Sequence, residues 1–215
     1  TLYLAGGSID NSSGAALTVA GNVIALANLN FVGTNDLTLA GRVTLPNDVA
    51  MNVVSGSTLT LTGVMVGGGA LSKTGSGTLV LSGESGVTGG TRVGAGTLTT
   101  IGNNRLSDFS LDVANGATLN LGGSENVGLL TGAGTINLGA NALTIGSDLS
   151  LATTAFGGTI AGTGSLVKFG PSTQNLLTTN SYSGGTFLRG GDLIVTGANQ
   201  EHGIIASRSG ARPPD

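Results

Sequence analysis

The sequence predicts an all-β protein, specifically a single-stranded parallel β-helix (a solenoid) of about ten coils with roughly 20 residues in each coil. Three observations predict it. Pairs of apolar residues separated by one other residue recur along the chain at a nearly constant spacing. Glycine, which makes up 40 of the 215 residues, clusters between these pairs, where it permits tight turns. No stretch of helical length shows the apolar spacing of an amphipathic helix.

Each recurring pair has the pattern of a short strand. In the segment Thr58–Thr62 the residues alternate, so that Leu59 and Leu61 share one face and the threonines share the other. Stacking of equivalent strands, about 4.8 Å apart, would build a narrow apolar interior. The pairs start 20, 22, 20, 19, 21 and 24 residues apart, at Leu17, Leu37, Leu59, Leu79, Leu98, Leu119 and Leu143.

A longer internal repeat supports the solenoid. Gly67–Leu98 aligns without a gap on Gly162–Leu193, at an offset of 95 residues. Because Leu, Lys and Thr fall in register as well as Gly, composition alone does not explain the match. Eleven positions are identical, and in the first copy they are Gly67, Gly69, Leu71, Lys73, Gly75, Thr78, Gly89, Gly90, Thr91, Gly96 and Leu98.

These motifs resemble the autotransporter-associated β-strand repeat, which occurs in passenger domains of Gram-negative autotransporters (type V secretion). In the second copy the segment Ser172–Leu176 replaces the Gly-Thr-Leu-x-Leu centre of the first. The first copy carries the pattern on Gly69, Leu71, Lys73, Gly75, Gly77, Thr78, Leu79, Leu81, Gly89, Gly90, Thr91, Gly96 and Leu98. The second copy carries it on Gly164, Leu166, Lys168, Gly170, Gly184, Gly185, Thr186, Gly191 and Leu193.

The resemblance implies a right-handed β-helix on the bacterial cell surface, tethered to the outer membrane through a C-terminal translocator barrel that this chain lacks. It also implies that the repeats aid export and folding. Residues 1–198 are expected to form the β-helical passenger fragment, with repeats at 67–98 and 162–193, and residues 199–215 an irregular C-terminal tail. The expected function is structural and adhesive. The chain would be a stiff stalk whose candidate partners are host extracellular matrix, cell-surface glycans and other copies of itself.

Composition excludes several other classes of function. With 8 basic and 11 acidic residues, the net charge of −3 gives no basic surface for nucleic acid. The absence of Cys and the single His202 exclude disulfide frameworks, Cys/His zinc sites and thiol catalysis. The glycine clusters at 67–69 and 75–77 precede no Walker-type Lys and no helix, so they are interpreted as turns. No cofactor, metal site or catalytic residue is predicted.

An enzyme on the same scaffold remains an alternative, since a polysaccharide lyase or hydrolase needs two or three carboxylates close together. The acidic pairs nearest to one coil apart are Glu84/Asp108, Glu125/Asp148 and Asp192/Asp215, and Asp112 could share a strand face with Asp108. These residues are interpreted as solvated turn residues. Three acids converging on one groove with a basic residue would favour the enzyme. A phage tail-spike-like or S-layer-like segment is a further alternative.

The two repeat lysines, Lys73 and Lys168, occupy equivalent positions. They are expected to point outward beside a turn, with the aliphatic stem covering apolar surface. The seven aromatic residues (five Phe and two Tyr) are dispersed and are interpreted as core filling or stacking between coils.

Overall fold

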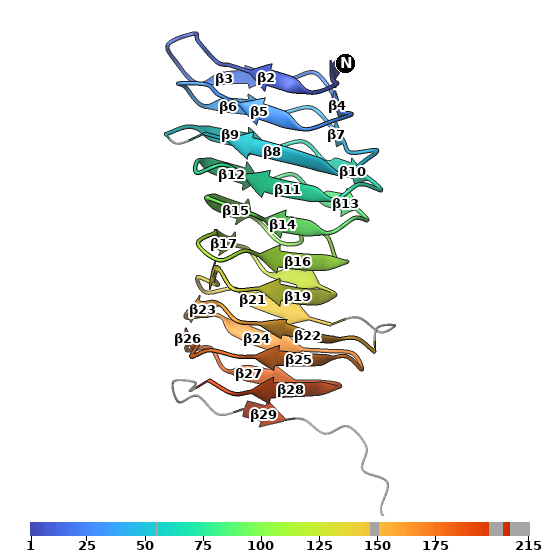
Figure 1. Ribbon diagram of the computed structural model, residues 1–215, viewed down its shortest axis with the longest axis vertical. Helices are drawn as coiled ribbons and strands as arrows, with labels where there is room; N and C mark the ends of the chain where they lie inside the picture. Colours follow the sequence, from blue (N-terminus) through green and yellow to red (C-terminus); the bar gives the residue numbers. More distant parts are fainter. Residues whose placement is uncertain (55, 147–150, 198–203, 207–215) are drawn as a thin grey trace, which may run out of the picture.

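The computed structural model describes residues 1–54, 56–146, 151–197 and the backbone of 204–206. Within these ranges the chain is all β, and every strand pairing is parallel, which confirms the predicted fold class (Figure 1). No helix in the described part has the length and apolarity that a transmembrane span requires.

The strands stack into one long sheet of ten strands and another of nine. The ten-stranded sheet consists of β2 (Gly7–Ile9), β5 (Leu29–Phe31), β8 (Val49–Val53), β11 (Leu71–Thr74), β14 (Thr91–Val93), β16 (Ser110–Val113), β19 (Leu129–Gly132), β22 (Thr153–Phe156), β25 (Thr173–Leu176) and β28 (Asp192–Val195). The nine-stranded sheet consists of β3 (Leu17–Val19), β6 (Leu37–Leu39), β9 (Thr58–Leu61), β12 (Thr78–Leu81), β15 (Thr97–Ile101), β17 (Thr118–Gly122), β20 (Thr135–Asn137), β23 (Thr159–Gly162) and β26 (Ser181–Tyr182).

Two sheets of five strands complete the coil. The N-terminal short sheet contains β1 (Leu2–Leu4), β4 (Val23–Ala25), β7 (Val43–Thr44), β10 (Met65–Gly67) and β13 (Ser85–Val87). The C-terminal short sheet contains β18 (Glu125–Val127), β21 (Ala142–Ile145), β24 (Ser165–Lys168), β27 (Thr186–Leu188) and β29 (Ile204–Ala206). A coil passes through a short sheet, the ten-stranded sheet and the nine-stranded sheet, as β10, β11 and β12 do, so ten strands in the longest sheet correspond to about nine turns.

The interior is a continuous column of apolar side chains, as the alternation predicts. In β9 the residues Leu59 and Leu61 are buried, whereas Thr58 and Thr60 face outward and are half-buried. Leu59 pairs with Leu37 on one side and with Leu79 on the other, so that identical side chains stack from coil to coil. Each strand is too short to hold a fold alone, and the stack supplies the apolar contacts that stabilise it.

One predicted member of the leucine series lies on a different face. The pair at Leu143 belongs to β21 in the C-terminal short sheet, where Leu143 pairs with Glu125 and Leu166. The nine-stranded sheet continues instead through Ile136, which pairs with Leu119. The final spacing of 24 residues therefore marks a jump between faces rather than one coil.

The two copies of the long repeat also begin on different faces. In the first copy Lys73 lies in β11 of the ten-stranded sheet, and the chain then enters β12 of the nine-stranded sheet. In the second copy Lys168 lies in β24 of the C-terminal short sheet, and the chain then enters β25 of the ten-stranded sheet. The same motif therefore fits more than one face, because each face offers parallel strands separated by a glycine corner.

Most of the predicted irregular tail, residues 199–215, lies outside the described residues. Within it, β29 pairs in parallel with β27 and adds a fifth strand to the C-terminal short sheet.

Candidate functional site

The regular coil is interrupted at one corner, in the segment Gly102–Phe109. This segment lies where a strand between β13 and β18 would join the two short sheets. Asn104 keeps the ladder connected, since its carbonyl accepts from Ser85 N at 3.4 Å and its N–H donates to Ser124 O at 3.0 Å. Asn104 also has a φ of 57°, a left-handed conformation that non-glycine residues seldom adopt. The two short sheets are thus halves of one face, separated by this segment.

A buried carboxylate holds the interrupting segment in place. Glu125 is 1% exposed, and its Oε2 accepts the backbone N–H groups of Arg105 at 2.8 Å and Leu106 at 3.0 Å. Burial raises the pKa of Glu125 above its ordinary value, while the two backbone N–H groups act in the opposite direction. The expectation that Glu125 is a solvated turn residue is therefore wrong. Its carboxylate accepts the backbone N–H groups of Arg105 and Leu106, which the carbonyls of a neighbouring strand would accept in a regular coil.

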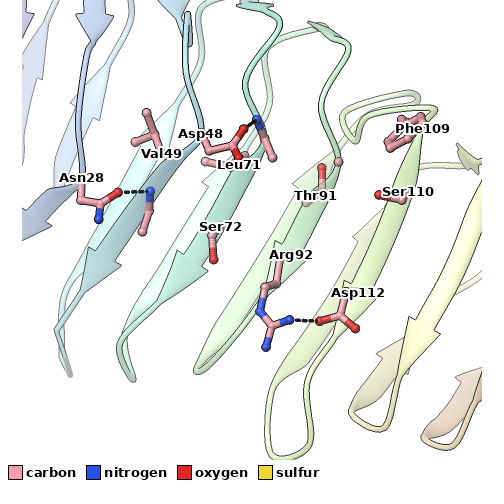
Figure 2. Close-up of a pocket in the computed structure, with 13 residues that line it drawn as sticks. Asn28, Asp48, Val49, Leu71, Ser72, Thr91, Arg92, Phe109, Ser110 and Asp112 are labelled. Atoms are coloured by element: carbon pink, nitrogen blue, oxygen red, sulfur yellow. Dashed lines mark hydrogen bonds and ion pairs between the residues drawn. The ribbon is translucent and has the colours of Figure 1, made fainter.

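A shallow hollow of about 490 Å³ lies beside this segment, on the outer surface of the ten-stranded sheet; we call it the groove. Figure 2 shows that it crosses the strands β8, β11, β14 and β16, with Phe109 near one end and the Arg92–Asp112 pair at another. It is lined by Asn28, Asp48, Val49, Ala50, Ala70, Leu71, Ser72, Gly90, Thr91, Arg92, Phe109, Ser110 and Asp112.

The groove is hollow because small side chains occupy successive outward positions. Ala50 pairs with Ser72, and Ser72 pairs with Arg92, so two small side chains precede the long ones of Arg92 and Asp112 in this row. Next to it lie Ala70 and Gly90, and the Ser110 hydroxyl occupies the place above Gly90 that a β-carbon would take. A coil surface of threonine and longer side chains would be flat at this place.

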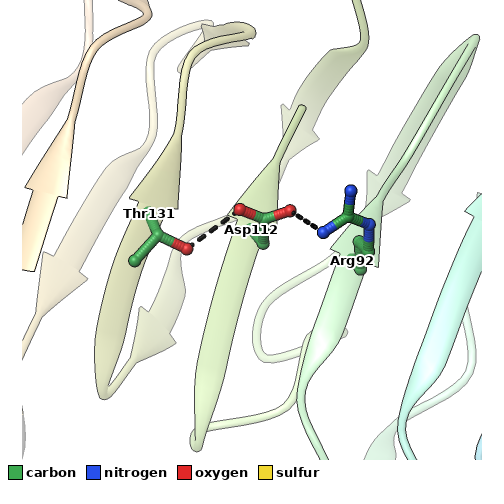
Figure 3. Close-up of polar contacts among 3 residues, drawn as sticks. All are labelled: Arg92, Asp112 and Thr131. Carbon is green, nitrogen blue, oxygen red and sulfur yellow. Dashed lines mark hydrogen bonds and ion pairs between the residues drawn. The ribbon is translucent and has the colours of Figure 1, made fainter. Parts of the chain in front are cut away.

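Charged residues form one wall of the groove. Arg92 Nη1 lies 2.7 Å from Asp112 Oδ2, and Thr131 Oγ1 donates to Asp112 Oδ1 at 3.0 Å (Figure 3). The three residues are in register on β14, β16 and β19. The Arg92 side chain is 59% exposed, so its other N–H donors can reach a ligand, whereas each oxygen of Asp112 already has one protein partner.

Phe109 stands on a ridge between two hollows. It is 62% exposed and lines both the groove and a second pocket of about 370 Å³. The second pocket is bordered by Asp108 and by the β13 strand. A large exposed aromatic residue next to hydrogen-bonding groups is typical of ligand sites. The exposure of Phe109 also shows that its interpretation as a core residue is wrong.

The repeat lysines correct another expectation, since both are fully buried. Lys73 Nζ donates to the carbonyl oxygens of Thr74 at 2.6 Å, Gly75 at 2.7 Å and Ala95 at 3.2 Å. Lys168 Nζ donates to those of Phe169 at 2.7 Å, Gly170 at 3.0 Å and Gly190 at 3.3 Å. The three donors of each ammonium are satisfied by carbonyls of two successive corners, and this compensates for burial of the charge.

Burial also shifts the acid–base behaviour of both lysines. It lowers the pKa of Lys73 from 10.5 to about 8. It lowers the pKa of Lys168 as well, with the nearby Asp192 acting in the opposite direction. Both residues are structural members of the repeat, and neither lines the groove or the pocket on the other side of Phe109.

The repeat glycines serve the same corners. Gly75 and Gly170, each directly after the residue that follows a lysine, have φ values of 73° and 68°. At Gly69 a β-carbon would overlap the carbonyl oxygen of Asn47, and at Gly164 it would overlap that of Asn141. A larger residue is excluded at Gly75 and Gly170 by the left-handed backbone, and at Gly69 and Gly164 by the overlap with a carbonyl oxygen.

The structure describes the predicted acidic pairs only in part. Glu125 stacks on Leu143, and Asp148 and Asp215 lie outside the described residues. Asp192 pairs with Thr173 on the ten-stranded sheet. Two other carboxylates, Asp48 and Asp112, line the groove with Arg92, and Asp48 Oδ1 accepts the N–H of Ala70 at 2.8 Å. No group of three or more His, Cys, Asp or Glu that could hold a metal ion occurs among the described residues.

Comparison with known proteins decides the family of the repeat. A model of the passenger-associated-transport-repeat matches residues 71–99 and 166–199. The chain carries two passenger-associated transport repeats. Both matched segments begin within the strands that hold the lysines, so the buried ammonium and the glycine corner belong to the passenger repeat itself.

A curated relative gives the same result. The chain is 37% identical over 200 residues to the adhesin BmaC autotransporter of Brucella suis biovar 1 (strain 1330). That alignment covers 88% of this chain but only 6% of the relative, so the chain corresponds to a small part of such a protein. No solved structure matches the chain significantly. The two matches confirm the resemblance to autotransporter passengers that the sequence indicates.

Proposed function

We propose that the chain is an adhesive stalk segment of a surface-exposed autotransporter passenger. The observation behind this proposal is the stack of about nine parallel turns, joined by a continuous ten-stranded sheet, that also carries two passenger repeats. Parallel ladders and a continuous apolar core make such a stack resist bending, since each turn contacts the turns before and after it. The relative's description as an adhesin supports an adhesive role over an enzymatic one.

The proposed location is the bacterial cell surface, with tethering to the outer membrane through a translocator barrel elsewhere in the parent protein. The right-handed sense of the coil is part of the proposal, and the strong preference of parallel strand connections for that hand supports it. In this proposal the repeats assist export and folding, because each added turn forms on a template that already exists. Host matrix, surface glycans and other copies of the chain are the candidate partners.

The proposal is tested by measuring adhesion of the purified chain. Surfaces coated with matrix proteins, host cells and polysaccharides are exposed to increasing concentrations of the chain, and bound protein is quantified. Saturable binding to at least one surface is expected. A folded, β-rich sample that binds none of them would contradict the adhesive part and leave only a spacer or folding role.

The enzyme alternative is tested on the same sample. Release of reducing ends or unsaturated products from the polysaccharides used for adhesion would indicate hydrolase or lyase activity. We expect none, since only two carboxylates line the groove and Asp112 is held by Arg92 and Thr131.

A further inference from the structure

We propose that the groove beside Phe109 binds a neutral oligosaccharide, and that this site supplies the adhesive contact of the segment. The inference rests on the adhesive function proposed above and names the ligand class of one site. It is carried by the shape of the groove, its side chains and its charge.

The position of the groove sets it apart from the repeated surface. It adjoins Gly102–Phe109, where a strand of the coil is replaced by a segment with a left-handed Asn104. Local irregularities of this kind concentrate at functional sites. The buried Glu125 holds this segment in one conformation through two backbone hydrogen bonds, and the segment in turn fixes the position of Phe109.

The side chains match the chemistry of a sugar. A sugar ring has an apolar C–H face and a rim of hydroxyl groups that donate and accept hydrogen bonds. Phe109 offers an exposed aromatic face, and Arg92 offers guanidinium donors beyond the one held by Asp112. Ser110, next to Phe109, and Ser72, on the other side of Arg92, add hydroxyl groups (Figure 2). The floor beside them carries only the methyl side chains of Ala50 and Ala70, which leaves room for a sugar ring to lie on the sheet.

The charges of the groove decide which sugars fit. Asp48 and Asp112 contribute two negative charges, Arg92 contributes one positive charge, and Asp108 borders the neighbouring pocket. A site with net negative charge repels sulfated, sialylated and uronate-rich chains. The same balance disfavours nucleic acid, whose binding depends on neutralising phosphates.

The backbone excludes the main alternative ligand, an added peptide strand. Strand addition needs a free sheet edge, but β11 pairs with β8 and β14, and β14 pairs with β16. A ligand of the groove must therefore contact outward side chains on the face of the sheet. Those side chains recur about every 4.8 Å from coil to coil, which suits an extended chain of repeating units.

The test uses the 215-residue chain, an array of oligosaccharides and five variants. The array carries neutral glucan, galactan and N-acetylglucosamine oligomers, with heparin, hyaluronan and sialylated chains as acidic probes. We expect saturable binding to one or more neutral oligomers and none to the acidic probes. Phe109→Ala and Arg92→Ala should each weaken that binding at least about tenfold, as loss of an aromatic or arginine anchor does. Ser72→Leu, which fills the floor, should abolish it.

Two matched controls isolate the site. Tyr3→Ala removes an aromatic side chain of similar exposure, 64% against 62%, from the first coil. Arg42→Ala removes an exposed arginine that lies outside the groove. Both should bind as the wild type does, and circular dichroism should show all five variants to be folded.

The outcomes separate this inference from the broader proposal. Preference for acidic probes, equal losses in the control variants, or no neutral binding by a folded chain would overturn the groove assignment. If the chain nevertheless adheres to matrix proteins or cells, and Phe109→Ala leaves that adhesion unchanged, the adhesive function stands and the groove is not its site. If nothing is bound on any surface, both fail.

Discussion

Lys73 and Lys168 lie 95 residues apart, and each places its ammonium group in an equivalent cage of three carbonyl oxygens at its own corner of the coil. They are also the only lysines in the sequence. In each cage two carbonyls come from the lysine's own corner and the third from the corner of the following coil. Each lysine therefore ties two turns of the stack together through main-chain atoms.

This burial predicts that neither lysine reacts with amine reagents while the chain is folded. Brief treatment with a water-soluble acetylating reagent should modify the α-amino group and leave Lys73 and Lys168 unmodified, as peptide mass spectrometry would show. In urea above the unfolding transition both should be modified at the rate of free lysine. Modification of either residue in the native chain, without loss of β structure, would contradict the buried position.

The lowered pKa of Lys73 predicts that stability depends on pH. The unfolded lysine binds its proton up to about pH 10.5, whereas the folded one releases it near pH 8. The unfolded state thus binds more protons in this window, and the free energy of unfolding should rise as the pH increases through it. Below pH 8 both states are protonated and the full cost of burying the charge is present.

Urea denaturation across that window measures the slope, with Lys73→Met as the control that lacks the titrating group. Lys168 contributes in the same direction, so the variant should keep part of the increase. A decrease in stability with pH would mean that the three carbonyl contacts favour the ammonium form more than burial disfavours it.

Glu125 predicts a contrast between two substitutions. Glu125→Ala leaves the N–H groups of Arg105 and Leu106 without an acceptor and should destabilise the chain by about 1–3 kcal/mol for each group left unpaired. Glu125→Gln keeps an acceptor oxygen, removes the buried charge and places an amide next to the Thr100 hydroxyl, which faces it. It should be as stable as the wild type or more so at neutral pH.

The pH dependence of stability in the wild type and in Glu125→Gln provides a check. Because the folded pKa of Glu125 is raised, the folded state binds a proton more tightly, and the wild type should gain stability as the pH falls from neutral toward 4.5. Glu125→Gln should lack this gain. Equal pH profiles in thermal unfolding would show that the carboxylate is not buried.

Two glycine substitutions should separate backbone conformation from packing. Gly75 and Gly116 have similar φ values of 73° and 78°, but a β-carbon at Gly75 would overlap the carbonyl oxygen of Val53 whereas one at Gly116 meets open space. Gly116→Ala should cost about 1–2 kcal/mol, the cost of a left-handed conformation in a residue with a side chain.

Gly75→Ala should cost clearly more, because the neighbouring corner must also shift. Urea midpoints of the two variants provide the comparison, with the denaturant slope showing whether the folded state has remained compact. Equal losses would mean that the corner yields to a methyl group without resistance.

The apolar columns were readable from the sequence because they depend on local alternation. Leu59 and Leu61 are separated by one residue and recur in the next coil, so the face that they share follows from strand geometry alone. The spacing could not show which of three faces a strand occupies. For this reason the spacing assigns Leu143 to the wrong column, although its local pattern correctly indicates a strand.

The charged residues were harder to place. A lysine is normally assigned to the surface. The carbonyl cage around Lys73 consists of backbone atoms, which every residue type has, so the sequence carries no signal for it. Arg92 and Asp112, in contrast, are 20 residues apart, one coil, and pairing opposite charges at that spacing would have found them. Gly102–Phe109 offers no such signal, since the sequence does not say that a strand will be missing there.

The change of face between the two passenger repeats has a geometrical consequence for how such proteins lengthen. The repeat begins on the ten-stranded sheet in one copy and on a short sheet in the other, so the offset of 95 residues is not a whole number of turns. Inserting or deleting a block of this size would keep the column of apolar side chains. It would also turn every later coil about the long axis, so that each strand moves to the neighbouring one of the three faces. The length of the stack and the orientation of a distant binding surface about the long axis would then change together.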